Sequence, residues 1–240
     1  GYENAFQILI GDGRVGEQLV KSTNIDIVCF TGSSSVGKII AKQCAETLKP
    51  HILELGGKDP MIVLNDANIN RAVDSAIFGG FSNAGQTCIS TEELYVENKI
   101  YDDFIFKISS KIKNIKSGSS GDYGSMIIDN NTEKVNRHIE DSRNGCQIIE
   151  GQTENKNTFI APTLVLEPNE NSLIVNEETF GPVISVRKFS DTNDLIEKIH
   201  KTGYGLSSSI FGKDMQKIDN IIKKLKIGTV SINDVLTHYG

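Results

Sequence analysis

The chain has 240 residues, of which 38% are hydrophobic and 23% are charged, a composition that is ordinary for a globular protein with one large or two small domains. Its net charge of -6 repels phosphate backbones on average, so we expect no nucleic-acid partner. No segment approaches the roughly 18 consecutive apolar residues that a membrane span needs, so we expect no membrane partner.

Short apolar or β-branched runs alternate along the chain with longer segments of helical periodicity. Strands are predicted at residues 6–10, 25–30, 52–55, 61–64, 93–97, 146–149, 163–166, 183–189 and 229–232. Helices are predicted at about residues 16–22, 36–48, 69–81, 101–113, 132–142, 192–200 and 215–225, with 132–142 polar and exposed. Residues 117–124 are predicted as a flexible loop. This alternation predicts an α/β fold with parallel strand pairing.

The cysteines are expected to be reduced thiols in a cytoplasmic protein. The four residues show no CxxC pair and no histidine at metal-ligand spacing, so we expect no metal site. A chain of this length does not need disulfides to hold its core. They are Cys29, Cys44, Cys88 and Cys146.

Cys88 is the cysteine with the most suggestive position. It follows the apolar helix that ends near Phe81, and Asn83 and Gly85 interrupt the helical pattern in between. We therefore expect Cys88 on a turn that can present its thiol to a cleft. The alternative is a small core residue, which is our interpretation of Cys29 and Cys44.

Glu54 lies at the end of a predicted strand, among apolar residues and just before Gly56-Gly57. Burial there raises the pKa of a carboxyl group and makes it a usable base near neutrality. The alternative is a glutamate on an edge strand, pointing to solvent. The two glycines allow a tight turn or the close approach of a ligand.

Four segments in this order resemble the signature segments of the aldehyde dehydrogenase superfamily, and the similarity extends over nearly the whole chain. Cys88 follows Glu54 by 34 residues, a separation that also resembles the family's. The segments are Phe30-Thr31-Gly32-Ser33, Leu53-Glu54-Leu55-Gly56-Gly57-Lys58, Gly85-Gln86-Thr87-Cys88 and Glu177-Glu178-Thr179-Phe180-Gly181-Pro182.

The resemblance implies an oxidoreductase that converts an aldehyde to a carboxylic acid with NAD or NADP. Cys88 would add to the aldehyde carbonyl and carry first a thiohemiacetal and then a thioester, with its own N–H helping to hold the oxyanion. Glu54 would activate the water that hydrolyses the thioester.

The resemblance also implies the cofactor-binding residues. Gly32 and Ser33 would meet the pyrophosphate where a helix begins, although Ser33 can also serve as a plain N-cap. Glu178 would bond the nicotinamide ribose and Phe180 would pack near the ring, whereas an ordinary loop entering a strand is the alternative. Leu55 would lie by the carboxamide, and an asparagine of the family near the site is matched by Asn233.

Residues 11–16 satisfy a GxGxxG pattern after a short apolar run, which is typical of a dinucleotide-binding turn. The acidic residue expected about 20 positions later is not convincingly placed. In the family this loop lies toward the adenine, so we interpret it as a turn outside the main phosphate site.

Compared with members of the family, we expect the chain to lack segments at both its N-terminal and its C-terminal end. We expect a partial Rossmann-type cofactor domain at residues 1–55 and an α/β catalytic domain at residues 56–240. We further expect a piece of a longer, homo-oligomeric enzyme that binds cofactor weakly alone. A CoA-acylating relative and a catalytically silent assembly domain are the alternatives; Glu54 opposes the first, and the retention of Cys88, Glu54 and Glu178 opposes the second.

Overall fold

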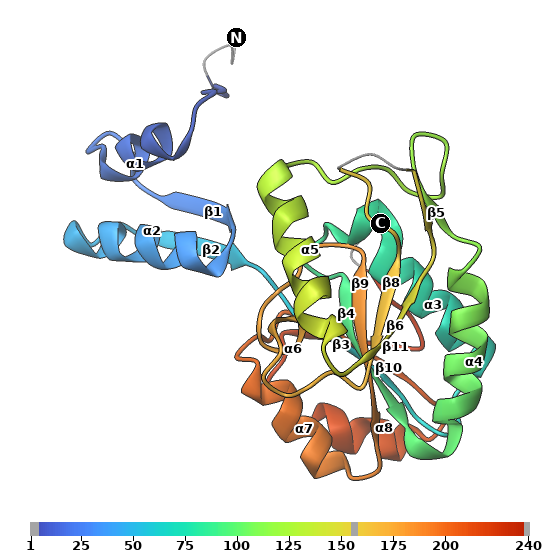
Figure 1. Cartoon of the computed structure of the whole chain (residues 1–240). Helices are drawn as coiled ribbons and strands as arrows, with labels where there is room; N and C mark the ends of the chain where they lie inside the picture. Colours follow the sequence, from blue (N-terminus) through green and yellow to red (C-terminus); the bar gives the residue numbers. More distant parts are fainter. Residues whose placement is uncertain (1–4, 155–157, 238–240) are drawn as a thin grey trace. The chain divides into compact units, whose positions relative to one another are not determined.

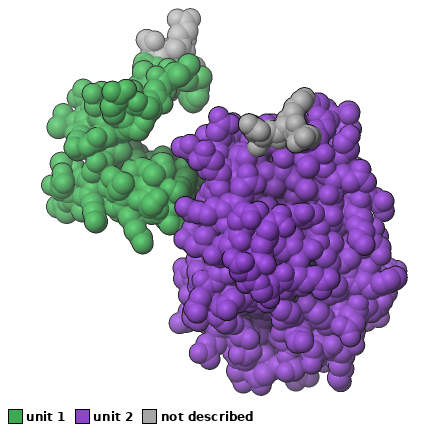
Figure 2. All heavy atoms as spheres, in the orientation of Figure 1, with its two compact units in different colours: residues 1–56 green, residues 57–240 purple. Residues whose placement is uncertain are grey.

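The computed structural model describes residues 5–154 and 158–237. The chain divides into two compact units, residues 1–56 and residues 57–240 (Figure 2). None of the helices in the described ranges is both long enough and apolar enough to cross a membrane.

The first unit is a β-α-β arrangement preceded by a helix (Figure 1). Its two strands pair in parallel, and the crossover between them is the longer helix. Val20, Ile40 and Cys44 are buried between the helices and the strands. The elements are α1 (Gly13–Lys21), β1 (Val28–Gly32), α2 (Ser34–Glu46) and β2 (His51–Leu55).

Two predicted strands in the first unit need correction. Residues 6–10 form no strand, and Phe6 and Ile10 are 80% and 96% exposed, because no neighbouring strand in the described ranges pairs with them. The buried strand predicted at 25–30 starts instead at Val28, and its residues are alternately half-buried and exposed. The hydrophobic pattern correctly predicted a strand, but other elements cover only one face of β1.

The second unit contains a seven-stranded sheet in the order β11-β10-β3-β4-β9-β8-β6. Every pairing in this sheet is parallel except that of β6 with β8. β5 (Lys116–Ser117) and β7 (Gln152–Thr153) form a separate parallel pair. The sheet strands are β3 (Asp59–Val63), β4 (Thr91–Glu97), β6 (Gln147–Glu150), β8 (Thr163–Leu166), β9 (Val183–Phe189), β10 (Ser207–Phe211) and β11 (Thr229–Ile232).

Helices cover both faces of this sheet, which confirms the predicted α/β fold (Figure 1). Met61 and Val63 of β3 pack in one core with α3, α4 and α5, while Ile62 packs in another with α7 and α8. This is the alternation expected of a strand that is buried on both faces. The helices are α3 (Ile69–Phe81), α4 (Tyr101–Ile112), α5 (Asp129–Arg143), α6 (Leu173–Asn176), α7 (Thr192–Lys201) and α8 (Met215–Ile222), with 3-10 turns η1 (Ser82–Gly85) and η2 (Asn98–Ile100).

Some elements of the second unit agree with prediction residue by residue, and others do not. α3, β8, β9 and β11 have the predicted limits. α5 was predicted to be exposed, but Val135, His138 and Ile139 are buried on its inner face. The loop predicted at 117–124 begins inside β5, and Ser117 forms a bridge with Tyr123. β10 was not predicted, because three consecutive serines conceal its buried position.

Candidate active site

Three backbone segments meet at one edge of the large sheet, where β3, β4 and β9 begin. These strands are parallel neighbours, so the residues that precede them lie together. The segments are residues 57–59 before and into β3, residues 83–92 before and into β4, and residues 177–182 before β9.

Cys88 lies on the turn predicted for it. α3 ends at Phe81, and Asn83, Ala84 and Gly85 then adopt positive φ values of 53°, 57° and 68°. The Ser90 N–H donates to the Thr87 carbonyl at 3.0 Å, which closes a turn around Cys88. The Cys88 side chain is exposed. Breaking the helix with left-handed residues therefore moves the thiol out of the core.

Gln86 fixes this turn against the rest of the unit. Its side chain is buried, and its Oε1 accepts the Ile127 N–H at 2.9 Å. Its Nε2 donates to the Asn83 carbonyl at 3.1 Å, and Asn83 Nδ2 donates in return to the Gln86 carbonyl at 3.1 Å. A buried amide with both ends bonded restricts the backbone just before Cys88.

Two glycines allow the three segments to approach one another closely. A Cβ at Gly85 would overlap the carbonyl oxygen of Gly181, and the positive φ of Gly85 already disfavours other residues. A Cβ at Gly57 would lie 2.5 Å from the Cys88 carbonyl oxygen. We expected the Gly56-Gly57 pair to allow a tight turn or the approach of a ligand; at Gly57 the close neighbour is the turn that carries Cys88.

The pKa of the Cys88 thiol is raised in this structure. Partial burial is the main cause, and the nearby Asp59 carboxyl adds to it. The backbone N–H groups of Cys88 and Ile89 act in the opposite direction, because they stabilise a negative sulfur. The thiol is therefore neutral at rest, and it needs a base or a positive charge before it can act as a nucleophile.

Glu178 and Phe180 lie on the segment that faces Cys88 across Gly57. Glu178 Oε1 accepts the Gly57 N–H at 3.1 Å, and the Glu178 N–H donates to the Tyr204 hydroxyl at 3.4 Å. Burial, followed by the charge of Glu92, raises the pKa of Glu178. Phe180 has a φ of 54°, which is uncommon for a bulky residue and is often found at functional sites.

Three buried charged residues of this site were not predicted: Lys58, Asp59 and Glu92. Lys58 Nζ and Glu92 Oε2 form an ion pair at 2.9 Å. Asp59 accepts the Ser207 N–H at 3.1 Å and also the Ser207 hydroxyl, yet burial raises its pKa to about 7. Two sequence signals could have indicated these residues. They are the charged pair Lys58-Asp59 after two glycines and the acidic pair Glu92-Glu93 near the start of β4.

The remaining predicted residues belong to the first unit. Gly32 ends β1, and Ser33 is the N-cap of α2, with its Oγ accepting the Val36 N–H at 3.4 Å. Leu55 packs against Gly37 of α2. The first turn of α2 therefore follows directly after a strand, a position that is common for anion sites at helix N-termini.

The side chain of Glu54 is exposed, which corrects the burial expected for it. Leu53 packs against the buried core of this unit, and successive side chains of a strand point to opposite faces. Glu54 consequently lies on the uncovered face of β2.

The side chain of Asn233 is hydrogen-bonded to the backbone of Gly212. It accepts the Gly212 N–H at 3.0 Å and donates to the Gly212 carbonyl at 2.9 Å.

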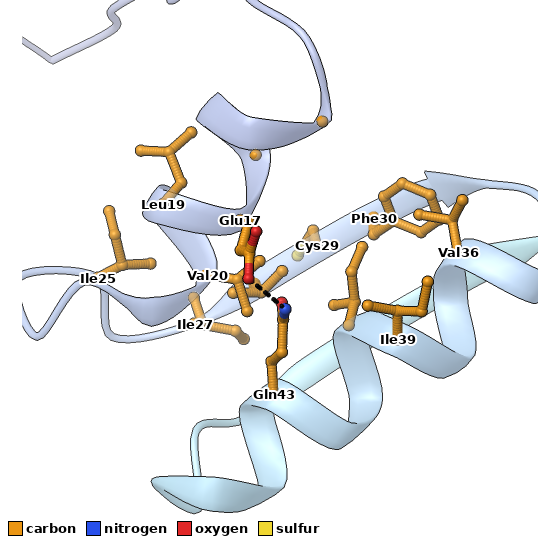
Figure 3. Close-up of a pocket in the computed structure, with 14 residues that line it drawn as sticks. Glu17, Leu19, Val20, Ile25, Ile27, Cys29, Phe30, Val36, Ile39 and Gln43 are labelled. Atoms are coloured by element: carbon orange, nitrogen blue, oxygen red, sulfur yellow. Dashed lines mark hydrogen bonds between the residues drawn. The ribbon is translucent and has the colours of Figure 1, made fainter.

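An apolar groove of about 640 Å³ lies between α1, β1 and α2 (Figure 3). Glu17 and Gln43 bridge it with a hydrogen bond of 3.3 Å. Gly13 and Gly16 of the GxGxxG segment line part of this groove. Both lie in the first turn of α1, which Asp12 caps, so this part of the segment is helical and not the turn that we predicted. Its apolar walls include Leu19, Val20, Ile27, Val28, Phe30, Val36, Ile39 and Ile40.

Comparisons with known proteins agree with the signature segments. A model of the aldehyde dehydrogenase family matches residues 3–239. The chain is 37% identical over 226 residues to an NADP(+) succinate-semialdehyde dehydrogenase of Schizosaccharomyces pombe, covering 91% of this chain and 46% of that protein. It is 38% identical over 236 residues to a lactaldehyde dehydrogenase of Methanococcus aeolicus, covering 95% and 50%.

A solved structure shows the same fold. Betaine aldehyde dehydrogenase of Staphylococcus aureus, in complex with NAD+, superposes with a TM-score of 0.88 at 33% identity, covering 94% of this chain and 47% of that one. The chain thus spans about half the length of the curated relatives that it matches. With the signature segments, the sheet and the family match in agreement, the chain belongs to the aldehyde dehydrogenase family.

Proposed function

We propose that this chain forms the catalytic part of an NAD(P)-dependent aldehyde dehydrogenase that releases a free carboxylic acid. The observation that supports this most directly is the turn of Cys88, which meets Gly57 and the segment of Glu178 at one sheet edge. In this proposal, residues 1–55 belong to the cofactor-binding domain and residues 56–240 form the catalytic domain.

The proposed reaction uses two residues in sequence. Cys88 Sγ, once deprotonated, adds to the aldehyde carbon to give a thiohemiacetal, whose oxygen is held by the Cys88 N–H. Loss of hydride from that carbon leaves a thioester on Cys88. Glu54 removes a proton from water, the resulting hydroxide attacks the thioester, and the acid leaves as the thiol is restored.

The oxidised nicotinamide cofactor would supply the hydride acceptor, and within each unit there are residues whose chemistry suits a part of it. The apolar groove suits a flat adenine, and Gly32 and Ser33 at the start of α2 suit the pyrophosphate. Glu178 offers a carboxylate to the nicotinamide ribose, Phe180 an apolar face to the ring, and Leu55 an apolar contact beside the carboxamide.

We propose both NAD and NADP as candidate cofactors. The Schizosaccharomyces pombe relative is named for NADP(+), and the Staphylococcus aureus structure is a complex with NAD+. The named relatives act on succinate semialdehyde and lactaldehyde, so we propose small aldehydes as the first substrates to test. We also propose a cytoplasmic enzyme, since the four cysteines are free thiols, and a homo-oligomeric one from the family resemblance alone.

The experiment is reduction of NAD or NADP followed by absorbance, with wild type, Cys88→Ala and the matched control Cys146→Ala. We expect Cys88→Ala to lower the rate by about three orders of magnitude or more, and the control to leave it unchanged. Chromatography of the product with CoA present distinguishes a free acid from an acyl-CoA. Equal rates in all three proteins, or acyl-CoA as the product, would contradict the proposal.

A further inference from the structure

Glu92 connects the turn of Cys88 to the segment of Glu178 and Phe180. It lies four residues after Cys88, at the start of β4, and its side chain is 5% exposed. Its Oε1 accepts the Thr179 N–H at 2.9 Å and the Phe180 N–H at 2.8 Å, and its Oε2 accepts the Thr179 N–H at 2.8 Å. One carboxylate thus holds two consecutive amides of the other segment.

Lys58 completes this arrangement. Its side chain is fully buried, its Nζ lies 2.9 Å from Glu92 Oε2, and it also donates to the Glu177 carbonyl at 2.8 Å. Burying an ion pair costs desolvation that its attraction often does not exceed, and apolar residues of similar volume frequently stabilise a fold as well. Stability alone therefore does not account for a buried lysine and glutamate at this place.

The Glu178–Phe180 segment has no regular secondary structure to stabilise it. Residues 178–180 belong to no helix or strand, so no regular backbone ladder fixes them. Phe180 has the left-handed φ of 54°, and such a conformation persists only when its surroundings determine it. Hydrogen bonds to a charged acceptor are among the strong ones, and here they are directed at the strained residue and its neighbour.

We propose that Glu92, balanced by Lys58, is a positioning residue that fixes the Glu178–Phe180 segment in the conformation that binds the nicotinamide end of the cofactor. This inference rests on the proposed function, because it gives Glu178 and Phe180 their cofactor contacts. It also makes the nucleophile and the cofactor segment parts of one rigid connection: residues 88 and 92 share the entry to β4, and Glu92 bonds directly to residues 179 and 180.

The first test measures amide hydrogen exchange at residues 177–182 in wild type, Glu92→Gln and the control Glu197→Gln, which changes an exposed glutamate on α7. Glutamine keeps the shape of Glu92 but has one acceptor oxygen and no charge. We expect exchange at Thr179 and Phe180 to become about tenfold faster or more in Glu92→Gln, and to stay unchanged in the control. Unchanged exchange in a folded Glu92→Gln protein would overturn the inference.

A second variant covers the case in which Glu92→Gln does not fold because Lys58 is left without its partner. Lys58→Met with Glu92→Gln removes both charges together and keeps similar volume, so we expect it to unfold at about the wild-type temperature. Its exchange at residues 179 and 180 should still be fast. Wild-type protection in this double variant would refute the role of the carboxylate.

The third readout separates positioning from general damage. In the intact enzyme we expect Glu92→Gln to raise KM for the cofactor about tenfold, with KM for the aldehyde and the rate of Cys88 alkylation within about twofold of wild type. Equal effects on both KM values would reject the positioning role in favour of a purely structural one. If wild type shows no dehydrogenase activity, the proposed function fails, whereas the exchange experiments still decide whether Glu92 fixes the segment.

Discussion

Asp59 should make this protein less stable as the pH rises. Its carboxyl group is buried beside Ser207, and burial raises its pKa from 3.8 to about 7. The folded state therefore binds a proton that the unfolded state releases between about pH 4 and pH 7, so ionisation favours unfolding across that range. Roughly three pKa units at about 1.4 kcal/mol each give an upper bound of about 4 kcal/mol.

Asp59→Asn tests this directly. Asparagine resembles the protonated acid, since its oxygen can accept the Ser207 N–H and its amide can donate to the Ser207 hydroxyl. Urea unfolding at about pH 4.5 and about pH 8 should show the variant gaining about 3 kcal/mol over wild type between these two values. Asp129→Asn, at an exposed position on α5, is the control. Parallel pH curves for wild type and Asp59→Asn would refute the reasoning.

Three further predictions concern the same sheet edge. Asp59→Asn should lower the pKa of Cys88 and speed its alkylation near pH 8 roughly two- to fivefold, since the carboxyl now raises that pKa; an unchanged rate would mean that burial alone sets it. Gly85→Ala should cost about 1–3 kcal/mol in urea unfolding, because its φ is positive and Gly181 leaves no room for a Cβ; a neutral result would contradict the close contact. Burial lowers the pKa of His138 from 6.5, so its contribution to stability should fall as the pH drops below about 6.5, opposite in sign to that of Asp59. Thermal unfolding should therefore show wild type losing stability relative to His138→Gln over that range; equal slopes would contradict a neutral, buried imidazole.

The sequence predicted those elements in which the spacing of apolar residues matches the faces that are buried. α3 and β9 alternate or repeat apolar residues over their whole length, and their limits agree with the structure. β10 was missed because Ser207, Ser208 and Ser209 give no hydrophobic signal, although Ser208 and Ser209 are buried by neighbouring strands. Residues 6–10 were wrongly assigned to a strand, since an apolar run cannot show whether a partner strand is available.

Only those features of the candidate site that depend on neighbouring residues in the sequence could be predicted. Asn83 and Gly85 indicated the turn of Cys88, and the turn is present. The anchoring role of Glu92 depends on residues 179 and 180, nearly ninety positions away, and no local pattern contains that contact. Glu54 shows the opposite failure: its apolar neighbours suggested burial, but the alternation of β2 places it on the uncovered face.

Burial, to which the charges around Gly57 add, explains why the Cys88 thiol is neutral at rest in the second unit. Lys58 is paired with Glu92, so its charge is already balanced there. Burial is the main cause that raises the pKa values of Asp59 and Glu178, and the charge of Glu92 adds to both. After burial, the charges of Asp59 and Glu178 add to the raised pKa of Cys88. A positive charge placed beside these three groups would lower all three pKa values, so it would favour the thiolate of Cys88.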